Sequence, residues 1–134
     1  MVLQRRSDGI TKTLLNRLSN LTDRAVVPAL WLYEEANVVE LAIRKRRTPA
    51  EKALVFLESL ADLPIEVANP SRAQVFVTVR TLAGQYQLTA YDAAHLELAI
   101  RHNLPMVSLY KALSRAALAA GLNTVQTRPP HVWC

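Results

Sequence analysis

The chain has 134 residues, of which 51% are hydrophobic and 20% are charged, and this composition is typical of one globular domain rather than of a disordered chain. Its apolar runs are much shorter than the roughly 20 residues of a membrane-spanning helix, and the first nine residues lack the apolar core of a signal peptide. Cys134 has no second cysteine with which to form an internal disulfide, so a reducing, cytoplasmic location is the default expectation.

The formal net charge of +5 permits a polyanionic partner such as nucleic acid. One basic cluster lies in the middle of the chain, at Arg44, Lys45, Arg46 and Arg47. Two interpretations of this cluster stay open. It is either a solvated helix end, where cations suit the macrodipole, or a contact with the phosphates of a nucleic acid.

The first part of the chain predicts two helices with a short strand between them. Leucines at helical spacing indicate a helix over residues 10–21. The apolar segment 24–27 is a candidate strand. Pro28 follows it and suits the first turn of a helix over about residues 29–46.

The next helix has better-marked ends. Thr48 is a candidate N-cap, Pro49 fits the first helical position, and Glu51 supplies a capping-box carboxylate. This helix should end near Ala61. Residues 63–67 then form a candidate strand with a proline at its edge.

The segment 75–79 carries conflicting signals. Its β-branched residues lower the helix propensity and leave a strand possible. The capping signals at residues 69–74 favour a helix that continues to about Tyr86, and we interpret the segment as helical.

The C-terminal part begins at residues 89–92, where threonine and aspartate have the spacing of a capping box. A helix, a short apolar strand over 105–109 and an alanine-rich helix ending at Gly121 are expected to follow. A last strand is possible at 123–125, and residues 126–134 should form a loose tail. Helices alternating with strands predict a single α/β sandwich domain with a mostly parallel sheet.

Three segments carry a resemblance to a known family. LTAYDAAHLELA at residues 88–99 and LPMVSLYKAL at 104–113 are similar to the C-terminal half of PIN domains, as found in ribonuclease toxins of the VapC type. PALWLYEEAN at residues 28–37 resembles the family motif PALWPLEVAN. The resemblance covers about residues 10–125 and implies a PIN-like three-layer sandwich.

In PIN-type ribonucleases, acidic residues hold one or two Mg²⁺ or Mn²⁺ ions that activate water and stabilise charge on the phosphate. The resemblance implies that Glu34 and Asp92 are the metal-binding and catalytic residues. It also implies RNA as the substrate, which the basic cluster 44–47 would dock, and an antitoxin protein as a partner, with a homodimer as a further option.

Several alternatives stay open at these positions. Glu35 is a neighbour of Glu34 that periodicity alone does not exclude, although Glu34 and Asn37 share a helix face with apolar residues. Asp92 can cap its helix, bind a metal, or do both. His95 stands where family members often have tyrosine, and no ligand role is expected for it.

Two of the four family acids have no counterpart here. The fourth falls at Tyr110, a poor Mg²⁺ ligand, and no acidic residue follows Glu97. The first belongs to a central strand that this sequence lacks, since Asp8 and Asp23 sit in no such strand. We therefore expect an N-terminally incomplete domain with unpaired strand edges and weak metal binding.

The resemblance implies two alternative functions. The first is a Mg²⁺-dependent endoribonuclease toxin of a type II toxin–antitoxin system, truncated or degenerate, with weak or no activity. The alternative is a non-catalytic PIN-like interaction module that binds an antitoxin or self-associates through the exposed faces of its first helices. A helix-turn-helix nucleic-acid binder is a third option, which would show no carboxylate cluster.

Overall fold

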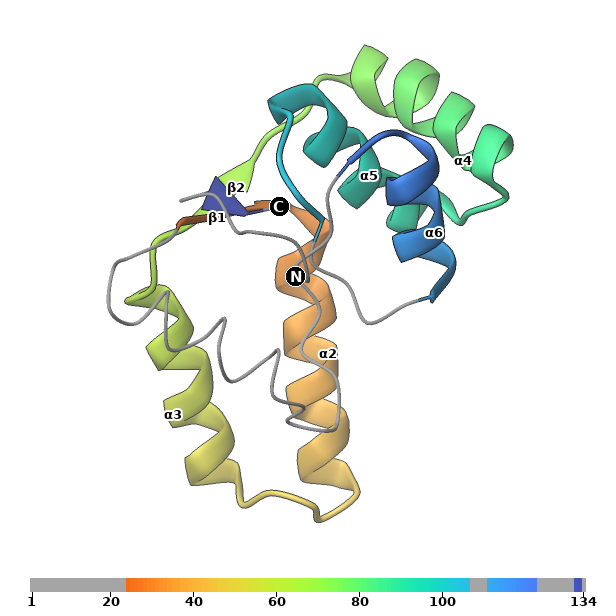
Figure 1. The fold of residues 1–134 in the computed structure, drawn as a ribbon. Helices are drawn as coiled ribbons and strands as arrows, with labels where there is room; N and C mark the ends of the chain where they lie inside the picture. Colours follow the sequence, from red (N-terminus) through yellow and green to blue (C-terminus); the bar gives the residue numbers. More distant parts are fainter. Residues whose placement is uncertain (1–23, 107–110, 123–131, 134) are drawn as a thin grey trace.

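In the computed structural model, residues 24–106, 111–122 and 132–133 are described, and they alternate between strands and helices (Figure 1). The elements in chain order are β1 (Arg24–Pro28), α2 (Leu30–Arg44), α3 (Ala50–Ala61), β2 (Ile65–Ala68), η1 (Gln74–Val79), α4 (Arg80–Tyr86), α5 (Ala90–His102), α6 (Lys111–Ala119) and β3 (Val132–Trp133). The helix predicted over 10–21 and the strand predicted at 123–125 lie outside the described residues.

β1 lies at the centre of a three-stranded parallel sheet with the order β2-β1-β3. Its register with β2 runs from Ala25 opposite Ile65 to Pro28 opposite Ala68. On its other side, Arg24 lies opposite Val132. The structure therefore differs from the expectation at two places: β1 has partners on both edges, and residues 132–133 of the expected loose tail belong to the sheet.

Side chains of β1 alternate between the two faces of the sheet, as strand geometry requires. Ala25 and Val27 pack with Trp31 of α2 and Leu60 of α3 in one core cluster. Val26 belongs to a second cluster, formed with residues of α5, α6 and the segments beside them: Leu96, Leu98, Ala99, Met106, Leu113, Ala116, Ala117 and Leu122. The sheet thus lies between α2 and α3 on one side and the later helices on the other, which is the predicted three-layer α/β arrangement (Figure 1).

α3 begins one residue later than the sequence predicted. Pro49 occupies the N-cap position with extended backbone angles, and no side chain caps this end of the helix. The capping box predicted at Thr48 and Glu51 is therefore wrong. With Pro49 outside the first turn, Thr48 lies one residue too far from the helix to accept from its free N–H groups.

The conflicting signals at residues 75–79 are decided by a capping box one turn earlier. The Ser71 amide donates to Gln74 Oε1 at 2.7 Å, and the Gln74 amide donates to Ser71 Oγ at 3.2 Å. This reciprocal pair starts a helix, so the predicted helical interpretation is confirmed. The β-branched run adopts the wider π form over Gln74–Val79 before α4 resumes the α form.

The ends of α5 and α6 follow the sequence closely. Thr89 is the N-cap of α5, and Asn103 ends it in the left-handed conformation with φ 51°. Gly121 follows α6 with φ 82°, a conformation that glycine adopts without the clash a Cβ would cause. Of the strand predicted over 105–109, Met106 forms a single bridge and residues 107–110 lie outside the described part of the chain.

Candidate functional site

Glu34 lies in the second turn of α2, shortly after the carboxyl end of β1, and its side chain meets α5. The Glu34 Oε1 atom is 3.1 Å from His95 Nε2, although 61 residues separate the two in sequence. The His95 side chain is 3% exposed and that of Glu34 is 30% exposed. This contact joins a helix from each of the two outer layers.

Asp92 precedes His95 by one helical turn on α5 and is half-buried. Its amide donates to Thr89 Oγ1 at 3.1 Å, so the capping interaction expected from the sequence is present. The negative charges of Asp92 and Glu34 both act on the His95 imidazole and favour its protonated form. The two candidate acids, one from each half of the chain, therefore lie around the same buried ring.

Burial lowers the pKa of His95 below its ordinary value of 6.5 and outweighs the hydrogen bond to Glu34 and the two negative charges, which raise it. The imidazole is consequently neutral at pH 7. An ionised carboxylate has no proton to give, so Nε2 must carry the hydrogen and donate it to Glu34. The tautomer of His95 is thereby fixed by its partner.

Periodicity alone did not exclude Glu35 beside Glu34, and the structure places these two side chains on different faces of α2. Glu35 lies on the buried face of α2 between Trp31 and Val39, each four residues away. Glu34 points instead toward α5. The helix face that carries Glu34 and Asn37 is less apolar in its surroundings than the sequence suggested. Asn37 is exposed, because α2 packs against β1 with the face that carries Trp31.

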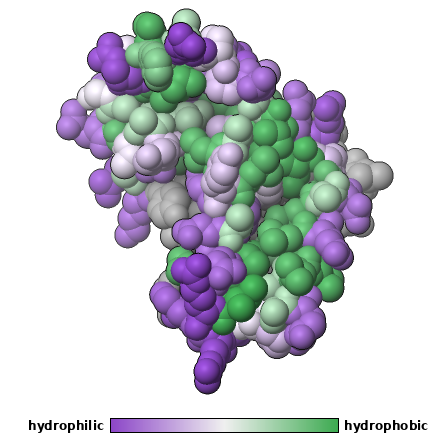
Figure 2. All heavy atoms as spheres, turned by 180° about the vertical axis from the view of Figure 1, so that it is seen from behind, coloured by the Kyte–Doolittle hydropathy of each residue, from purple (hydrophilic) through white to green (hydrophobic). Residues whose placement is uncertain are grey.

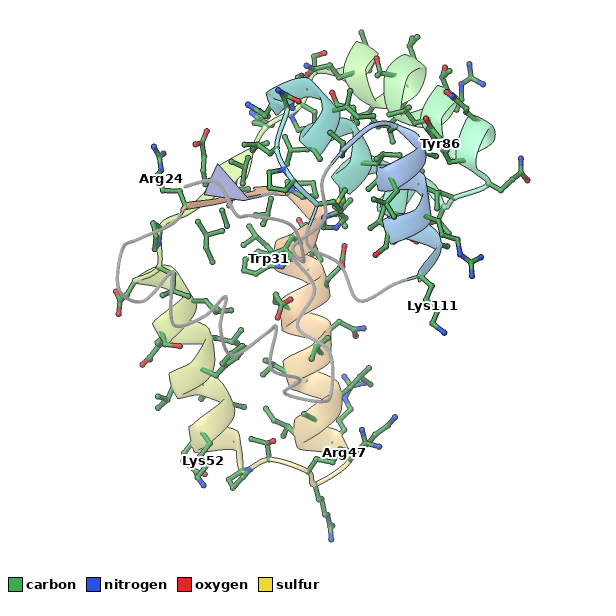
Figure 3. The ribbon with its side chains drawn as sticks, viewed as in Figure 1. Arg24, Trp31, Arg47, Lys52, Tyr86 and Lys111 are labelled. Atoms are coloured by element: carbon green, nitrogen blue, oxygen red, sulfur yellow. The ribbon has the colours of Figure 1, made fainter. Side chains whose placement is uncertain are left out.

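The basic cluster, Arg44 to Arg47, lies at the opposite end of α2 from Glu34, in the turn that leads into α3. All four residues are exposed, and Arg44 Nε also donates to Glu40 Oε1 at 3.0 Å. Figure 3 shows Arg47 and Lys52 at the same end of the helical pair, on the side away from the sheet. The geometry is compatible with both a solvated helix end and a phosphate contact.

The donor atoms at the Glu34 and Asp92 pair do not fit a divalent cation. In the described ranges, no group of three or more His, Cys, Asp or Glu side chains could hold a metal ion. Mg²⁺ requires near-octahedral oxygen ligation. One oxygen of Glu34 is already held by His95, and an Nε2 that carries hydrogen has no lone pair for a metal. Among the described residues, this leaves too few ligands for a site of the expected kind. Tyr110, the counterpart of the fourth family acid, lies outside the described residues.

A comparison with known protein families identifies the family of this chain. The PIN domain family matches residues 3–118, which is most of the chain. The chain belongs to the PIN domain family. PIN domains are in general nuclease-type domains that bind nucleic acid and use divalent metal ions. The family predicted from the sequence is therefore confirmed. The match begins at residue 3, closer to the N-terminus than the resemblance had suggested.

No curated protein and no solved structure matches the PIN chain. Among the helices in the described ranges, none combines the length and the apolar character that crossing a bilayer requires.

Sequence reasoning missed the part played by His95 in this PIN domain. It assigned the residue no ligand role, and it did not foresee the contact with Glu34. A signal was present in the spacing, since His95 lies three residues after Asp92 and therefore on the same helix face. What the spacing does not contain is the position of α2, which depends on how both helices pack on the sheet.

Proposed function

We propose that this PIN domain is a VapC-type protein of a toxin–antitoxin pair that binds RNA and an antitoxin but cleaves RNA weakly or not at all. The observation that carries the proposal is the 3.1 Å contact between Glu34 Oε1 and His95 Nε2. One oxygen of the carboxylate that matches a metal ligand of the family accepts a hydrogen bond from a buried imidazole. A Mg²⁺ or Mn²⁺ ion would therefore bind weakly, with Glu34 and Asp92 as its candidate ligands.

RNA binding is supported by charge and placement. The basic cluster 44–47 is exposed at the tip of the α2–α3 pair, and Lys52 adds a further cation there (Figure 3). Glu34 lies on the same helix, about 15 Å along the axis from Arg44 at 1.5 Å per residue. An RNA strand lying along α2 would contact the basic tip with its phosphates while it passes the Glu34 and Asp92 pair.

A binding experiment tests the RNA part of this proposal. A labelled single-stranded RNA is titrated with the wild-type chain and with the double variant Arg46→Ala/Arg47→Ala over a range of salt concentrations. We expect roughly tenfold weaker binding for the variant. The slope of log K against log salt should also be shallower by about 0.7 for each RNA phosphate that the variant no longer neutralises.

The matched control removes the same charge elsewhere. Arg72 and Arg115 are exposed residues of other elements, so Arg72→Ala/Arg115→Ala lowers the net charge equally without touching the tip. Equal affinity losses in both double variants would reduce the effect to net charge and contradict a specific RNA site at residues 44–47.

A cleavage experiment tests the catalytic part. The purified 134-residue chain is incubated with RNA and Mg²⁺, and the expected result is little or no cleavage. Rapid Mg²⁺-dependent cleavage that Asp92→Asn abolishes would overturn the proposal and show that the chain is an active ribonuclease.

The non-catalytic interaction module remains a second candidate because α2 and α3 expose apolar side chains. Leu32 and Tyr33 are exposed on α2, and Leu54 and Val55 are exposed on α3. Apolar residues also gather in a band on the face seen from behind (Figure 2). An exposed apolar surface of this kind is typical of a protein-binding site. Stable binding of an antitoxin together with no measurable affinity for RNA would favour this candidate.

A further inference from the structure

We propose that His95 takes the place of a divalent cation beside Glu34, so that the acidic pair of this PIN domain is organised by an imidazole and not by a metal. We call the hydrogen-bonded pair of Glu34 and His95 the clasp. The inference rests on the PIN-type function proposed above and names the group that organises its site.

The His95 imidazole contacts the Glu34 carboxylate and feels the negative charge of Asp92. Glu34 approaches the ring from α2, and Asp92 lies one turn before it on α5. Carboxylates that are brought together repel each other, and a cation or a hydrogen-bond donor relieves the repulsion. Nuclease sites of the metal-dependent type use a cation for this purpose. In the described part of the chain, His95 supplies the donor that faces Glu34.

The His95 side chain is almost entirely shielded from solvent, so water does not readily replace its contact with Glu34. A metal ion that drew Glu34 away would leave a buried N–H group without its acceptor, and that loss opposes metal binding. The clasp therefore competes with a cation for Glu34 Oε1.

The clasp also holds together two helices that a bound metal ion would otherwise link. α2 and α5 belong to different layers of the sandwich, and the Glu34 to His95 contact links them near the carboxyl end of β1. A metal ion bound by acids from both helices would make a similar link. The clasp makes it with atoms of the protein alone.

Two substitutions at Glu34 distinguish a carboxylate held by the hydrogen bond from His95 from one held by a metal ion. In Glu34→Gln, the amide oxygen still accepts from Nε2–H, but an uncharged amide is a much weaker ligand for Mn²⁺. In Glu34→Leu, both interactions are removed. Thermal unfolding of the wild type and of both variants is measured with EDTA and with millimolar MnCl₂.

The clasp predicts that the wild-type unfolding midpoint is the same with EDTA as with MnCl₂. Glu34→Gln should unfold within about 2 °C of the wild type, and Glu34→Leu should unfold several degrees lower. Glu40→Gln and Glu40→Leu are the matched controls, because Glu40 is an exposed residue of the same helix that pairs only with Arg44 among the described residues. Neither control should move the midpoint by more than about 2 °C.

A spectroscopic readout keeps the test decisive if Glu34→Leu fails to fold. The ¹⁵N shifts of the His95 ring in the wild-type chain should report a neutral imidazole with hydrogen on Nε2. MnCl₂ should not broaden these resonances selectively. Mn²⁺ that broadens them, or that raises the midpoint of the wild type but not of Glu34→Gln, would overturn the clasp.

Failure of the clasp is distinguishable from failure of the proposed function. Stabilisation by Mn²⁺ together with RNA binding at the basic tip would reject the clasp and keep an RNA-binding PIN protein. A midpoint insensitive to Mn²⁺ together with no RNA or antitoxin binding would support the clasp and reject the proposed function.

Discussion

His95 Nε2 lies 3.1 Å from Glu34 Oε1, so a buried ring on α5 holds a carboxylate that α2 presents from the other half of the chain. The contact links the two outer layers of the sandwich at the end of the sheet where β1 leads into α2. It also couples the stability of the fold to the protonation of one side chain, because the pKa of His95 is shifted by its burial.

The stability of the domain should therefore fall as the pH drops through 6.5. The pKa of His95 is lowered in the folded protein from its ordinary value of 6.5, with burial as the largest cause. Below pH 6.5 the unfolded chain binds a proton that the folded chain does not bind, so protons favour unfolding. The contribution is fully present above pH 6.5 and is lost by up to about 1.4 kcal/mol per pH unit until the folded pKa is reached.

Urea unfolding at pH 7.5, 6.5 and 5.5 measures this dependence. The other ionisable groups are common to every variant, so the informative quantity is the difference between the wild type and His95→Gln, which has no titrating ring at this position. His102→Gln changes an exposed histidine of the same helix and should retain the wild-type profile. A profile for His95→Gln that is as steep as that of the wild type would contradict the assignment.

Thr89→Ala should destabilise the domain by about 1 kcal/mol, within a usual range of 0.5–2 kcal/mol. Thr89 Oγ1 accepts from the Asp92 amide at 3.1 Å, and alanine leaves that amide without its cap. Thr89→Ser retains the oxygen and should recover most of the loss. Thr81→Ala, at an exposed position within α4, is the control and should be neutral in the same urea titration.

The sequence predicted the parts of the fold that depend on local signals. Thr89 marks the start of α5, and Gly121 follows the end of α6. Pro28 also lies where β1 gives way to α2, but as the last residue of the strand and not in the first turn of the helix, as the sequence had predicted. Each residue acts through its own backbone geometry or through a neighbour within one turn. The elements that contain them were therefore visible without any knowledge of the tertiary structure.

The parts that sequence reasoning missed depend on distant contacts. Val132 pairs with Arg24 in a parallel sheet. A strand of two residues is too short to show the alternating pattern from which a strand is predicted. The family resemblance selected Glu34, but periodicity did not exclude Glu35, because the rotation of α2 is set by the packing of Trp31 against β1. The clasp needs α2 and α5 to be placed together, which no spacing within either helix reveals.

Leu113→Ala should cost about 2–5 kcal/mol, because it removes a large side chain from the core cluster between the sheet and α6. Leu118→Ala makes the same chemical change on the same helix and should stay within about 0.5 kcal/mol. The two residues differ in exposure, 1% for Leu113 and 59% for Leu118. Equal losses in urea unfolding would mean that α6 does not pack as described.

Two arginine–glutamate pairs at helical spacing among the described residues should differ sharply in their contribution to stability. Arg101 Nε lies 2.8 Å from Glu97 Oε1 on α5, and Arg44 Nε lies 3.0 Å from Glu40 Oε1 on α2. The Glu97 side chain is 6% exposed, whereas that of Glu40 is 53% exposed. Water therefore replaces the arginine readily at Glu40 but not at Glu97.

Arg101→Leu should consequently cost about 1–3 kcal/mol, because it leaves a buried carboxylate without its charged partner. Arg44→Leu should cost no more than about 0.5 kcal/mol, the usual contribution of a solvated pair four residues apart. Urea unfolding at neutral pH compares the two variants. Adding Glu97→Gln to Arg101→Leu should restore part of the lost stability, because an uncharged amide is less costly to bury than an unpaired carboxylate. Equal losses for Arg101→Leu and Arg44→Leu would show that burial of Glu97 does not determine the strength of its ion pair.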